Sequence, residues 1–389
     1  MSKHLCICFS LLEISYWSFH ASFIGFISAF LLENGISNTM LSLLIAGYFL
    51  STVIGSFVWG AVCDYLHTNK KVLLITLVCS AILMYLIYFF SSNIVLLFVF
   101  YPLLGFTSLP SSSNIDVWLL NSCKHDLSLY GKIRCTPSIF YGIVAFFLGK
   151  LIDVHGYSLM LGSATFFICL GIAMVIILPE TTTVSNKSEP VQLNLNTIRK
   201  LFESKEYIFL IIILFLLGLV IAPINNLKAT IISSVNGTVA DIGIDAFFGT
   251  AIQAVFIFLA GYTNKLPLKI RYLIVTFMPW TMLVLTFIAT STPLVFFGTF
   301  IYNIGYGVML PLMRCITERC VNKDLQNLGQ NIADSTFTSA SAILSLLYSG
   351  AIIDAFGVKT MLLFCIAISS VACLMACFKK KGAVALTDE

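Results

Sequence analysis

The sequence predicts an all-α membrane protein of twelve transmembrane helices, arranged as two six-helix halves. The first observation is composition: 59% of the 389 residues are hydrophobic, 10% are charged, and the mean hydropathy is +0.97. A soluble chain of this length needs far more charge to cover its surface. The second observation is that apolar runs of about 20 residues recur along the chain, the length that crosses a ~30 Å hydrocarbon core. The third is that the second half repeats residues of the first.

The apolar runs give twelve expected crossings, separated by short polar breaks. In order, they are residues 5–32, 38–63, 71–90, 93–121, 131–152 and 158–178, then 206–228, 243–262, 270–289, 294–317, 328–353 and 359–378. The first run is too long for the apolar region of a signal peptide and lacks a convincing cleavage site, so we expect a retained helix. The long polar stretch 179–205 is the expected linker between an N-terminal bundle, 1–178, and a C-terminal bundle, 206–389.

Lysine and arginine in the loops predict the orientation of the chain. With the N-terminus in the cytoplasm, the outer loops carry only Lys150, Lys228 and Lys359. The inner segments carry Lys3, Lys70, Lys71, Lys124, Lys132, Lys187, Arg199, Lys200, Lys205, Lys265, Lys269, Arg271, Arg319, Lys323, Lys379, Lys380 and Lys381. We therefore expect a multi-pass protein of the cytoplasmic membrane with both termini inside. The remaining two basic residues, Arg134 and Arg314, fall in or beside apolar runs.

The two halves share a pattern around their fourth and fifth crossings. In the first half it reads Tyr101, Pro110, Asp126-Leu127, Gly131 and then Gly149-Lys-Leu-Ile-Asp153-Val-His-Gly156. In the second half it reads Tyr302, Pro311, Asp324-Leu325, Gly329 and then Gly350-Ala-Ile-Ile-Asp354-Ala-Phe-Gly357. Internal repeats with a binding site between them are the architecture of many secondary transporters.

Two helical hairpins carry opposite charges at mirrored positions. The four residues are Asp116 and Arg134, equally far from a turn at His125, and Arg314 and Asp334, equally far from a turn at Asp324. Groups equidistant from the turn of an antiparallel hairpin come level with each other, so each pair can meet. Ionisable residues at that depth are costly and mark a substrate or ion pathway.

The loop between the second and third crossings reads Gly60-Ala-Val-Cys-Asp64, followed by Lys70 and Lys71. This pattern resembles the signature loop of the major facilitator superfamily. Tyr65 stands where that family usually has arginine, and His67 where it has glycine. Together with the two G-x-x-I-D-x-x-G endings, the resemblance covers nearly all of the chain. It implies the major facilitator fold and secondary active transport.

Within that superfamily the chain resembles the oligosaccharide and nucleoside proton symporters typified by lactose permease. The resemblance lies in Asp116, in Tyr130-Gly131-Lys132-Ile133-Arg134, and in Tyr141. It implies that the acid and the arginine bind substrate hydroxyls while the ring of Tyr141 packs on a sugar face. That group has Glu and Trp at the positions of Asp116 and Tyr141, which argues against a galactoside. Its His-x-x-Glu proton site is replaced by Tyr302-Asn303-Ile304-Gly305.

The residues themselves also support a functional Asp116–Arg134 pair, because a guanidinium–carboxylate pair is tolerable at low dielectric and can exchange for substrate contacts. The alternative is an ordinary pair at the cytoplasmic helix ends, with Arg134 reaching the headgroups.

Glu13 is the candidate coupling residue. Trp17 and His20 follow at i+4 and i+7 on the same helical face, and burial disfavours the charged form of a carboxylate, so such a group can carry a proton. The alternative is a solvated helix start at the inner interface. His20 is either a second coupling group or a packed histidine.

Amides in the second half are candidates for binding a polar, ring-shaped solute. They are Asn225 and Asn226 beside Pro223, Gln253, and Asn303 between two tyrosines. The alternatives are a helix end for Asn225 and Asn226, and a helix–helix hydrogen bond for Asn303.

Three further groups are candidates for gating. Gly60 would allow close helix approach, and Asp64 would act as a conformational latch. The alternative is an ordinary cytoplasmic loop that carries the positive charges expected on that side. Arg314 belongs either to a gate or to an interfacial pair with Glu318, four residues on. Asp334 is expected deeper in the membrane, facing the cavity or packed away from it.

The leading hypothesis is a secondary transporter for a small polar solute, sugar- or nucleoside-like, working by alternating access and coupled to a proton or another cation. The alternative is a drug or metabolite exporter of the same fold; a membrane sensor and a membrane-embedded enzyme have less support. The sequence contains no G-x-x-x-x-G-K-[ST] motif for ATP binding and no nucleophile–base or metal-ligand spacing. We expect a monomer with no enzymatic activity, no cofactor, no metal and no nucleic-acid partner.

Overall fold

The computed structural model describes residues 3–123, 126–134, 136–180, 201–263, 265–322 and 325–379, and this part of the chain contains helices and no strand. Twelve spans within it are long and apolar enough to cross a bilayer. The predicted fold class is therefore confirmed, and the chain is an integral multi-pass membrane protein. The expected linker falls largely on 181–200, outside the described residues.

The first six spans contain eight helices. These are α1 (Lys3–Ser22), α2 (Ile24–Glu33), α3 (Asn38–Leu66), α4 (Asn69–Phe89), α5 (Ile94–Ser122), α6 (Leu127–Arg134), α7 (Thr136–His155) and α8 (Ser158–Ile177). The first span is divided at Phe23 into α1 and α2. The turns that the charged hairpins were expected to share, at residues 125 and 324, lie outside the described residues.

The second half of the chain contains the remaining described helices. These are α10 (Lys205–Asn226), α11 (Lys228–Ser233), α12 (Val239–Phe258), α13 (Ala260–Thr263), α14 (Leu268–Ile288), α15 (Thr292–Cys320), α16 (Gln326–Ser335), a π-helical turn η2 (Thr336–Ala340), α17 (Ser341–Phe356) and α18 (Val358–Phe378). Helices α11 and α13 lie between the membrane spans. The π-helical turn locally widens the helix of the eleventh span, because its hydrogen bonds join residues five apart. Gly218 of α10 packs against it so closely that a Cβ atom would overlap Phe337 O and Ser341 Oγ.

Side-chain caps explain several of the helix boundaries. Ser37, Thr68 and Ser204 each accept a hydrogen bond from the backbone N–H three residues later, and Asn93 accepts from Val95 and Leu96. These bonds satisfy donors that the first turn of a helix leaves unpaired. Polar residues between apolar runs therefore fix where these four helices begin.

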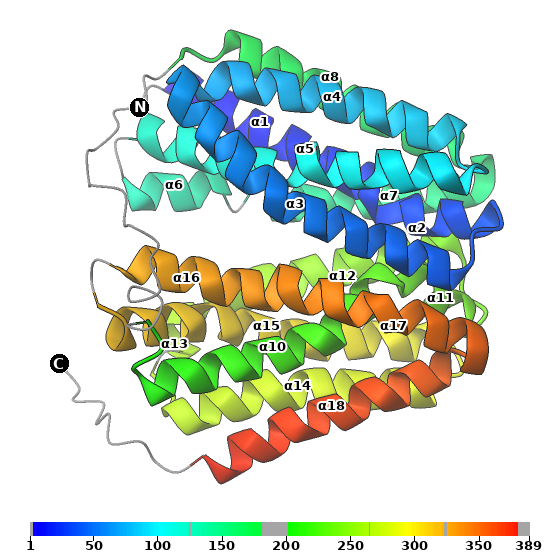
Figure 1. The fold of residues 1–389 in the computed structure, drawn as a ribbon, viewed down its shortest axis with the longest axis vertical. Coiled ribbons are helices and arrows are strands. Elements are labelled where there is room, and N and C mark those ends of the chain that lie inside the picture. Colours follow the sequence, from blue (N-terminus) through cyan, green and yellow to red (C-terminus); the bar gives the residue numbers. More distant parts are fainter. Residues whose placement is uncertain are drawn as a thin grey trace.

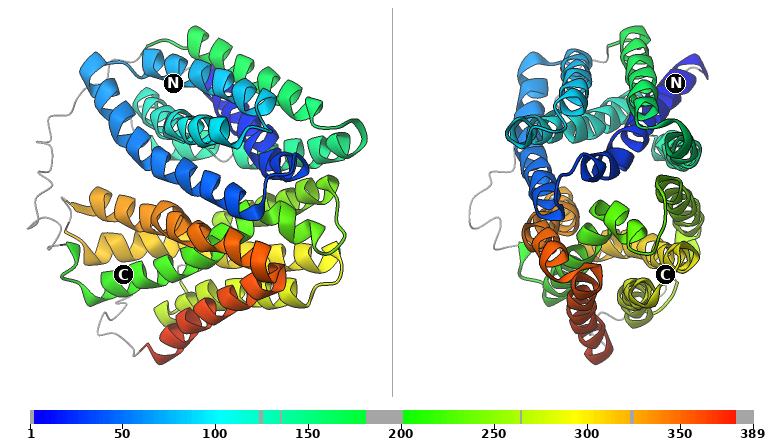
Figure 2. Two further views of the ribbon diagram at one scale, coloured as in Figure 1. Left: turned by 45° about the vertical axis from the view of Figure 1, so that its right-hand side comes forward. Right: turned by 90° about the vertical axis from the view of Figure 1, so that its right-hand side faces the viewer.

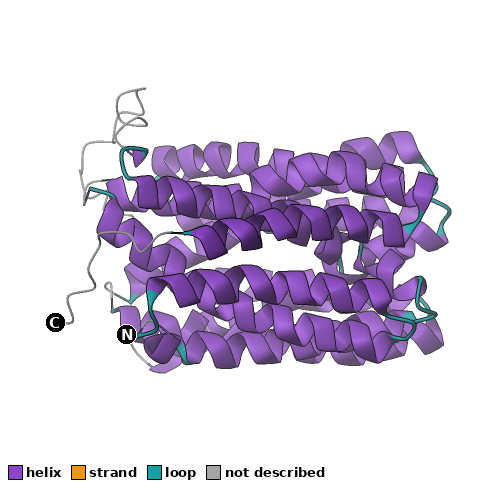
Figure 3. Cartoon of the chain, turned by 90° about the horizontal axis from the view of Figure 1, so that it is seen from below, coloured by secondary structure: helices purple, strands orange, loops and turns teal. Residues whose placement is uncertain are grey.

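The helices form two groups that lie side by side (Figure 1), with α1–α8 in the upper group and α10–α18 in the lower. Seen along the helix axes, the two groups remain separate rings of helices (Figure 2, right). The larger hydrophobic cluster contains buried residues of both groups, and a second cluster lies within the second half of the chain. The helices run nearly parallel, with the described loops gathered at two ends (Figure 3). We call the end where α8 ends and α10 begins the linker end, and the opposite end the distal end.

The two groups meet along two helix pairs, α7 with α12 and α3 with α17. Glycines bring the backbones together at both contacts. A Cβ atom on Gly243 would overlap Ala145 O, and one on Gly350 would overlap Asn38 O. These close approaches allow the groups to meet tightly while leaving space between them elsewhere.

A carboxylate joins α3 and α17 at the distal end. Asp354 Oδ1 accepts hydrogen bonds from Asn38 N at 3.2 Å and Nδ2 at 2.9 Å, and its Oδ2 accepts from Thr39 N at 2.7 Å and Oγ1 at 2.6 Å. Thr230 Oγ1 of α11 also donates to Asn38 Oδ1 at 2.5 Å. The carboxylate thus caps the N-terminus of a helix in the other group, where the helix dipole favours a negative charge.

Candidate functional site

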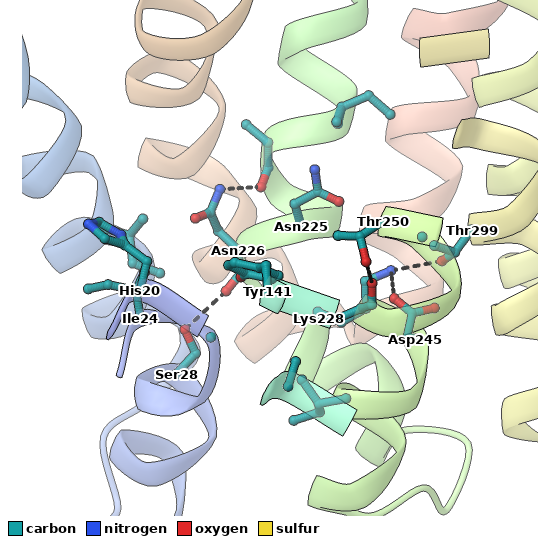
Figure 4. Close-up of a pocket in the computed structure, with 18 of the residues that line it drawn as sticks. His20, Ile24, Ser28, Tyr141, Asn225, Asn226, Lys228, Asp245, Thr250 and Thr299 are labelled. Carbon is teal, nitrogen blue, oxygen red and sulfur yellow. Dashed lines mark hydrogen bonds and ion pairs between the residues drawn. The ribbon is translucent and has the colours of Figure 1, made fainter. Parts of the chain in front are cut away.

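A cavity of about 550 Å³ lies between the two groups of helices (Figure 4). Its walls come from α1, α2, α3, α5 and α7 on one side and from α10, α11, α12, α15 and η2 on the other. Aromatic rings from both groups line it, among them Trp17, Tyr48, Tyr101, Tyr302 and Tyr306. Mostly apolar walls with a few convergent polar groups are typical of a small-molecule site.

Several residues predicted from the sequence meet at this cavity. They are His20, Tyr141, Asn225, Asn226, Gln253 and Asn303. Asn226 and Asn303 each donate an amide N–H to a carbonyl four residues earlier, Ala222 O and Thr299 O, both at 2.8 Å. Within the described residues the structure shows no partner for their side-chain oxygens. Those oxygens are therefore available to accept hydrogen bonds from a solute.

Sequence reasoning missed a buried ion pair on the cavity wall. Lys228 Nζ lies 2.9 Å from Asp245 Oδ2 and donates to Thr299 Oγ1 at 3.2 Å, as Figure 4 shows. The placement of Lys228 in an outer loop was wrong, because α11 begins there and the side chain is only 13% exposed. A usable signal was present: Asp245 is an acid inside an apolar run, the same criterion that selected Asp116.

The first charged hairpin closes as predicted. Arg134 Nε lies 2.8 Å from Asp116 Oδ1, and Tyr130 donates its hydroxyl to the same oxygen at 3.1 Å. Glu13 joins the pair, with its Oε2 3.8 Å from an Arg134 terminal nitrogen. Glu13 is 1% exposed, so the alternative of a solvated helix start was wrong. We call Glu13, Asp116 and Arg134 the charged triad.

The charged triad lies beside the cavity rather than on its wall. None of its three residues lines the cavity, but Trp17 does, and the Arg134 guanidinium lies 5.3 Å from the centre of the Trp17 ring. A cation over an indole face is an attractive contact. Along α1, Glu13 precedes Trp17, so the triad lies towards the linker end. Trp17 therefore separates the charges from the cavity in this structure.

The second charged hairpin does not close. No ion pair within 4 Å joins Arg314 to Asp334 or to Glu318, all of which are described residues. The predicted meeting of this pair is not realised in this structure, where Arg314 lies on the exposed face of α15 while its neighbours Met313 and Ile316 are buried. Asp334 is half-buried, accepts a hydrogen bond from Gln330 at 3.5 Å, and does not line the cavity.

The signature loop has a different close contact from the predicted one. A Cβ atom on Gly60 would meet nothing within 4 Å, so the expected close approach there was wrong. The tight crossing lies nearer the middle of α3, where a Cβ on Gly55 would overlap Phe106 O. Asp64 is exposed and shows no ion pair among the described residues, and its role as a latch stays a prediction.

Lys70 of the signature loop serves as a helix cap. Its Nζ donates to Ile176 O at 2.8 Å and Leu178 O at 2.7 Å, which are unpaired carbonyls at the end of α8. Within the described residues, no three His, Cys, Asp or Glu side chains are placed to hold a metal ion.

Twelve spans in two groups around a central cavity define the major facilitator class of membrane protein. The sequence model of the MFS_1 like family matches residues 8–365, and the chain belongs to that family. No curated protein matches the chain.

Solved structures confirm the fold. A crystal structure of the nucleoside transporter NupG matches with a TM-score of 0.82 and 16% identity, covering 97% of this chain and 100% of that one; a single-site mutant of NupG gives 0.83. A bacterial homologue of the human lysosomal transporter Spinster, described as inward-facing and unoccupied, matches with a TM-score of 0.69 and 11% identity, covering 97% of both chains.

Proposed function

We propose that the protein is a secondary transporter that carries a small polar organic solute, of nucleoside or sugar type, through the central cavity. The observation that carries the proposal is the cavity of about 550 Å³, enclosed by both groups of helices and lined by amides and aromatic rings. Its volume lies within the usual range for small-molecule sites. The structural similarity to NupG makes a nucleoside the first solute to test.

Alternating access would follow from the closed distal end. Asp354 joins α17 to the N-terminus of α3 there, so the solute would exchange with the linker side in this state. The lysine and arginine distribution supports a cytoplasmic linker end, with both termini inside the cytoplasmic membrane. A rocking movement of one group against the other would then open the distal end. A single chain holds the whole cavity, so a monomer suffices.

The charged triad supports proton coupling. With both carboxyls ionised, Glu13 and Asp116 carry one more charge than Arg134 neutralises, so one proton restores neutrality in this poorly solvated cluster. Glu13 is the better carrier because its side chain is 2% exposed against 28% for Asp116. The triad would sense the solute through Trp17, which contacts both Arg134 and the cavity.

Right-side-out vesicles with an imposed inward proton gradient test this function. We expect labelled uridine to accumulate inside, and a protonophore to abolish the accumulation. Loss of preloaded uridine under the same gradient would contradict uptake and support export. A protein that neither binds nor moves uridine or simple sugars would contradict the solute class.

A further inference from the structure

The ion pair on the cavity wall leaves one carboxylate oxygen without a donor. Asp245 Oδ2 is satisfied by Lys228 at 2.9 Å, but Asp245 Oδ1 is buried and has no hydrogen-bond partner among the described residues. The residue is 4% exposed, so in this state the oxygen is shielded from bulk solvent. A buried, unsatisfied acceptor on an ionised group is expensive and calls for a donor.

The missing partner is a donor and not an anion. Lys228 already contacts both Asp245 Oδ2 and Thr299 Oγ1, and only 13% of its side chain is exposed. An anionic solute would have to displace Asp245 from Lys228 and leave a buried carboxylate unpaired, which costs far more than the new contact returns. A neutral solute with hydroxyl groups can donate to Asp245 while the ion pair stays intact.

A second unsatisfied atom lies on the opposite wall of the same cavity. His20 Nε2 of α1 is buried without a hydrogen-bond partner among the described residues, and His20 and Asp245 both line the cavity (Figure 4). His20 belongs to the first group of helices and Asp245 to the second. Each of the two groups that would move therefore contributes to the cavity lining a residue with a buried polar atom that lacks a partner among the described residues.

We propose that Asp245 is the acceptor that binds vicinal hydroxyl groups of a neutral solute at the Lys228 side of the cavity, with Lys228 holding the carboxylate in place. This inference rests on the proposed function and adds to it an uncharged, diol-bearing solute and its orientation. The hydroxyl-rich part lies against α12, and the remainder extends towards the aromatic and amide wall formed by Asn225 and Tyr302.

A thermodynamic cycle that changes Asp245 in the protein and the hydroxyl groups in the ligand tests the proposed hydrogen bonds. Uridine and 2′,3′-dideoxyuridine, which lacks both ribose hydroxyls, are titrated by calorimetry into purified full-length native protein, Asp245→Asn and Asp241→Asn. Asp241 is the matched control, because it lies one turn earlier on α12, does not line the cavity, and accepts a hydrogen bond from Thr238 N. The native protein and Asp241→Asn should prefer uridine by roughly tenfold to a hundredfold.

In Asp245→Asn that preference should disappear, with both nucleosides binding about equally weakly. Because Asp245→Asn leaves Lys228 unpaired and could unfold the protein, the double variant Lys228→Gln/Asp245→Asn is measured as well. It restores a neutral hydrogen-bonding pair and should also lack the preference for uridine. A general structural defect would instead weaken both nucleosides by the same factor and keep their ratio.

Three results would overturn the inference. If Asp245→Asn or the double variant keeps the native preference for uridine, the hydroxyls bind elsewhere while the proposed function stands. If native protein binds uridine 5′-monophosphate more tightly than uridine, Lys228 recruits an anion. If native protein binds neither nucleoside, nor ribose as a simple diol, the proposed function fails and the inference fails with it.

Discussion

The hairpins α5–α7 and α15–α17 carry opposite charges at matching distances from their turns, but they use them differently. In the first, Asp116 and Arg134 meet at 2.8 Å and Glu13 of α1 joins them. In the second, Arg314 is exposed and has no ion pair to Asp334 within 4 Å. Equal spacing from a turn fixes the depth of two residues, whereas the helix face decides whether their side chains point at each other.

The two G-x-x-I-D endings show the same divergence at the distal end. Asp354 accepts four hydrogen bonds from Asn38 and Thr39 of the other group. Asp153, its counterpart in the first half, is exposed and shows no such bond among the described residues. The N-terminus of α12 is capped locally instead, by Asp241 from the same helix. One repeat thus joins the two groups of helices by hydrogen bonds, and the other only by a close packing contact. We call the contact of Asp354 with Asn38 and Thr39 the distal latch.

Replacing the two arginines gives the largest expected difference between the hairpins. Arg134→Ala leaves Glu13 and Asp116 without their cation, and removing one partner of a poorly solvated pair typically costs about 3 kcal/mol or more. We expect uridine uptake into proteoliposomes to fall by roughly 100-fold, with the protein still present in the membrane. Arg314→Ala is the control and should keep near-native uptake. Equal losses in both variants would show that the hairpins are equivalent.

Glu13→Gln should separate coupling from movement of the solute. The amide keeps the shape of the side chain but cannot take up or release a proton, so gradient-driven accumulation should fall by about tenfold or more. Exchange of labelled for unlabelled uridine, which needs no net proton transfer, should continue. Glu318→Gln on the second hairpin should change neither measurement. Full gradient-driven accumulation by Glu13→Gln would exclude Glu13 as the proton carrier.

Asp354→Asn and Asp153→Asn compare the two repeat endings. The amide in Asp354→Asn removes a charged acceptor of four hydrogen bonds, so the backbone N–H groups of Asn38 and Thr39 should exchange hydrogen for deuterium roughly three- to tenfold faster. Asp153→Asn should leave exchange at the start of α12 unchanged. Mass spectrometry of the corresponding peptides reports both rates. Unchanged exchange in Asp354→Asn would mean that the latch does not hold the distal end closed.

Neutralising the second hairpin should have the smallest effect. Arg314 is exposed and forms no ion pair with Asp334 within 4 Å, and the Asp334 side chain accepts a long hydrogen bond from Gln330. Arg314→Gln and Asp334→Asn should therefore each change the free energy of unfolding by less than about 0.5 kcal/mol. Thermal unfolding in detergent measures this. A strong destabilisation that the double variant does not increase would reveal a coupling between the two residues.

The depth of a residue in the membrane could be predicted from the sequence, but the direction in which its side chain points could not. Apolar runs gave the twelve spans because length and hydropathy act locally along the chain. The contact between Asp116 and Arg134 followed from spacing, and so did the common face of Trp17 and His20. The sequence places Asp245 inside an apolar run, but its pairing with Lys228 could not be predicted, because only the start of α11 brings Lys228 into the cavity. Similarly, nothing in the sequence around Asp354 indicates that it caps α3, since that contact depends on how the two groups of helices meet.

Blocking the cavity tests the central claim, that the solute passes between the two groups, most directly. Gly25 lines the cavity, and a Cβ there meets only ordinary contacts, with Tyr141 Oη at 3.7 Å. Gly25→Trp would therefore attach a large ring in the solute path at a position where the Cβ atom itself has room. Gly162→Trp is the matched control, on α8 away from the cavity with open space beside it. In proteoliposomes, uridine counterflow should disappear in Gly25→Trp and persist in Gly162→Trp. Native counterflow in a folded Gly25→Trp protein would contradict the account.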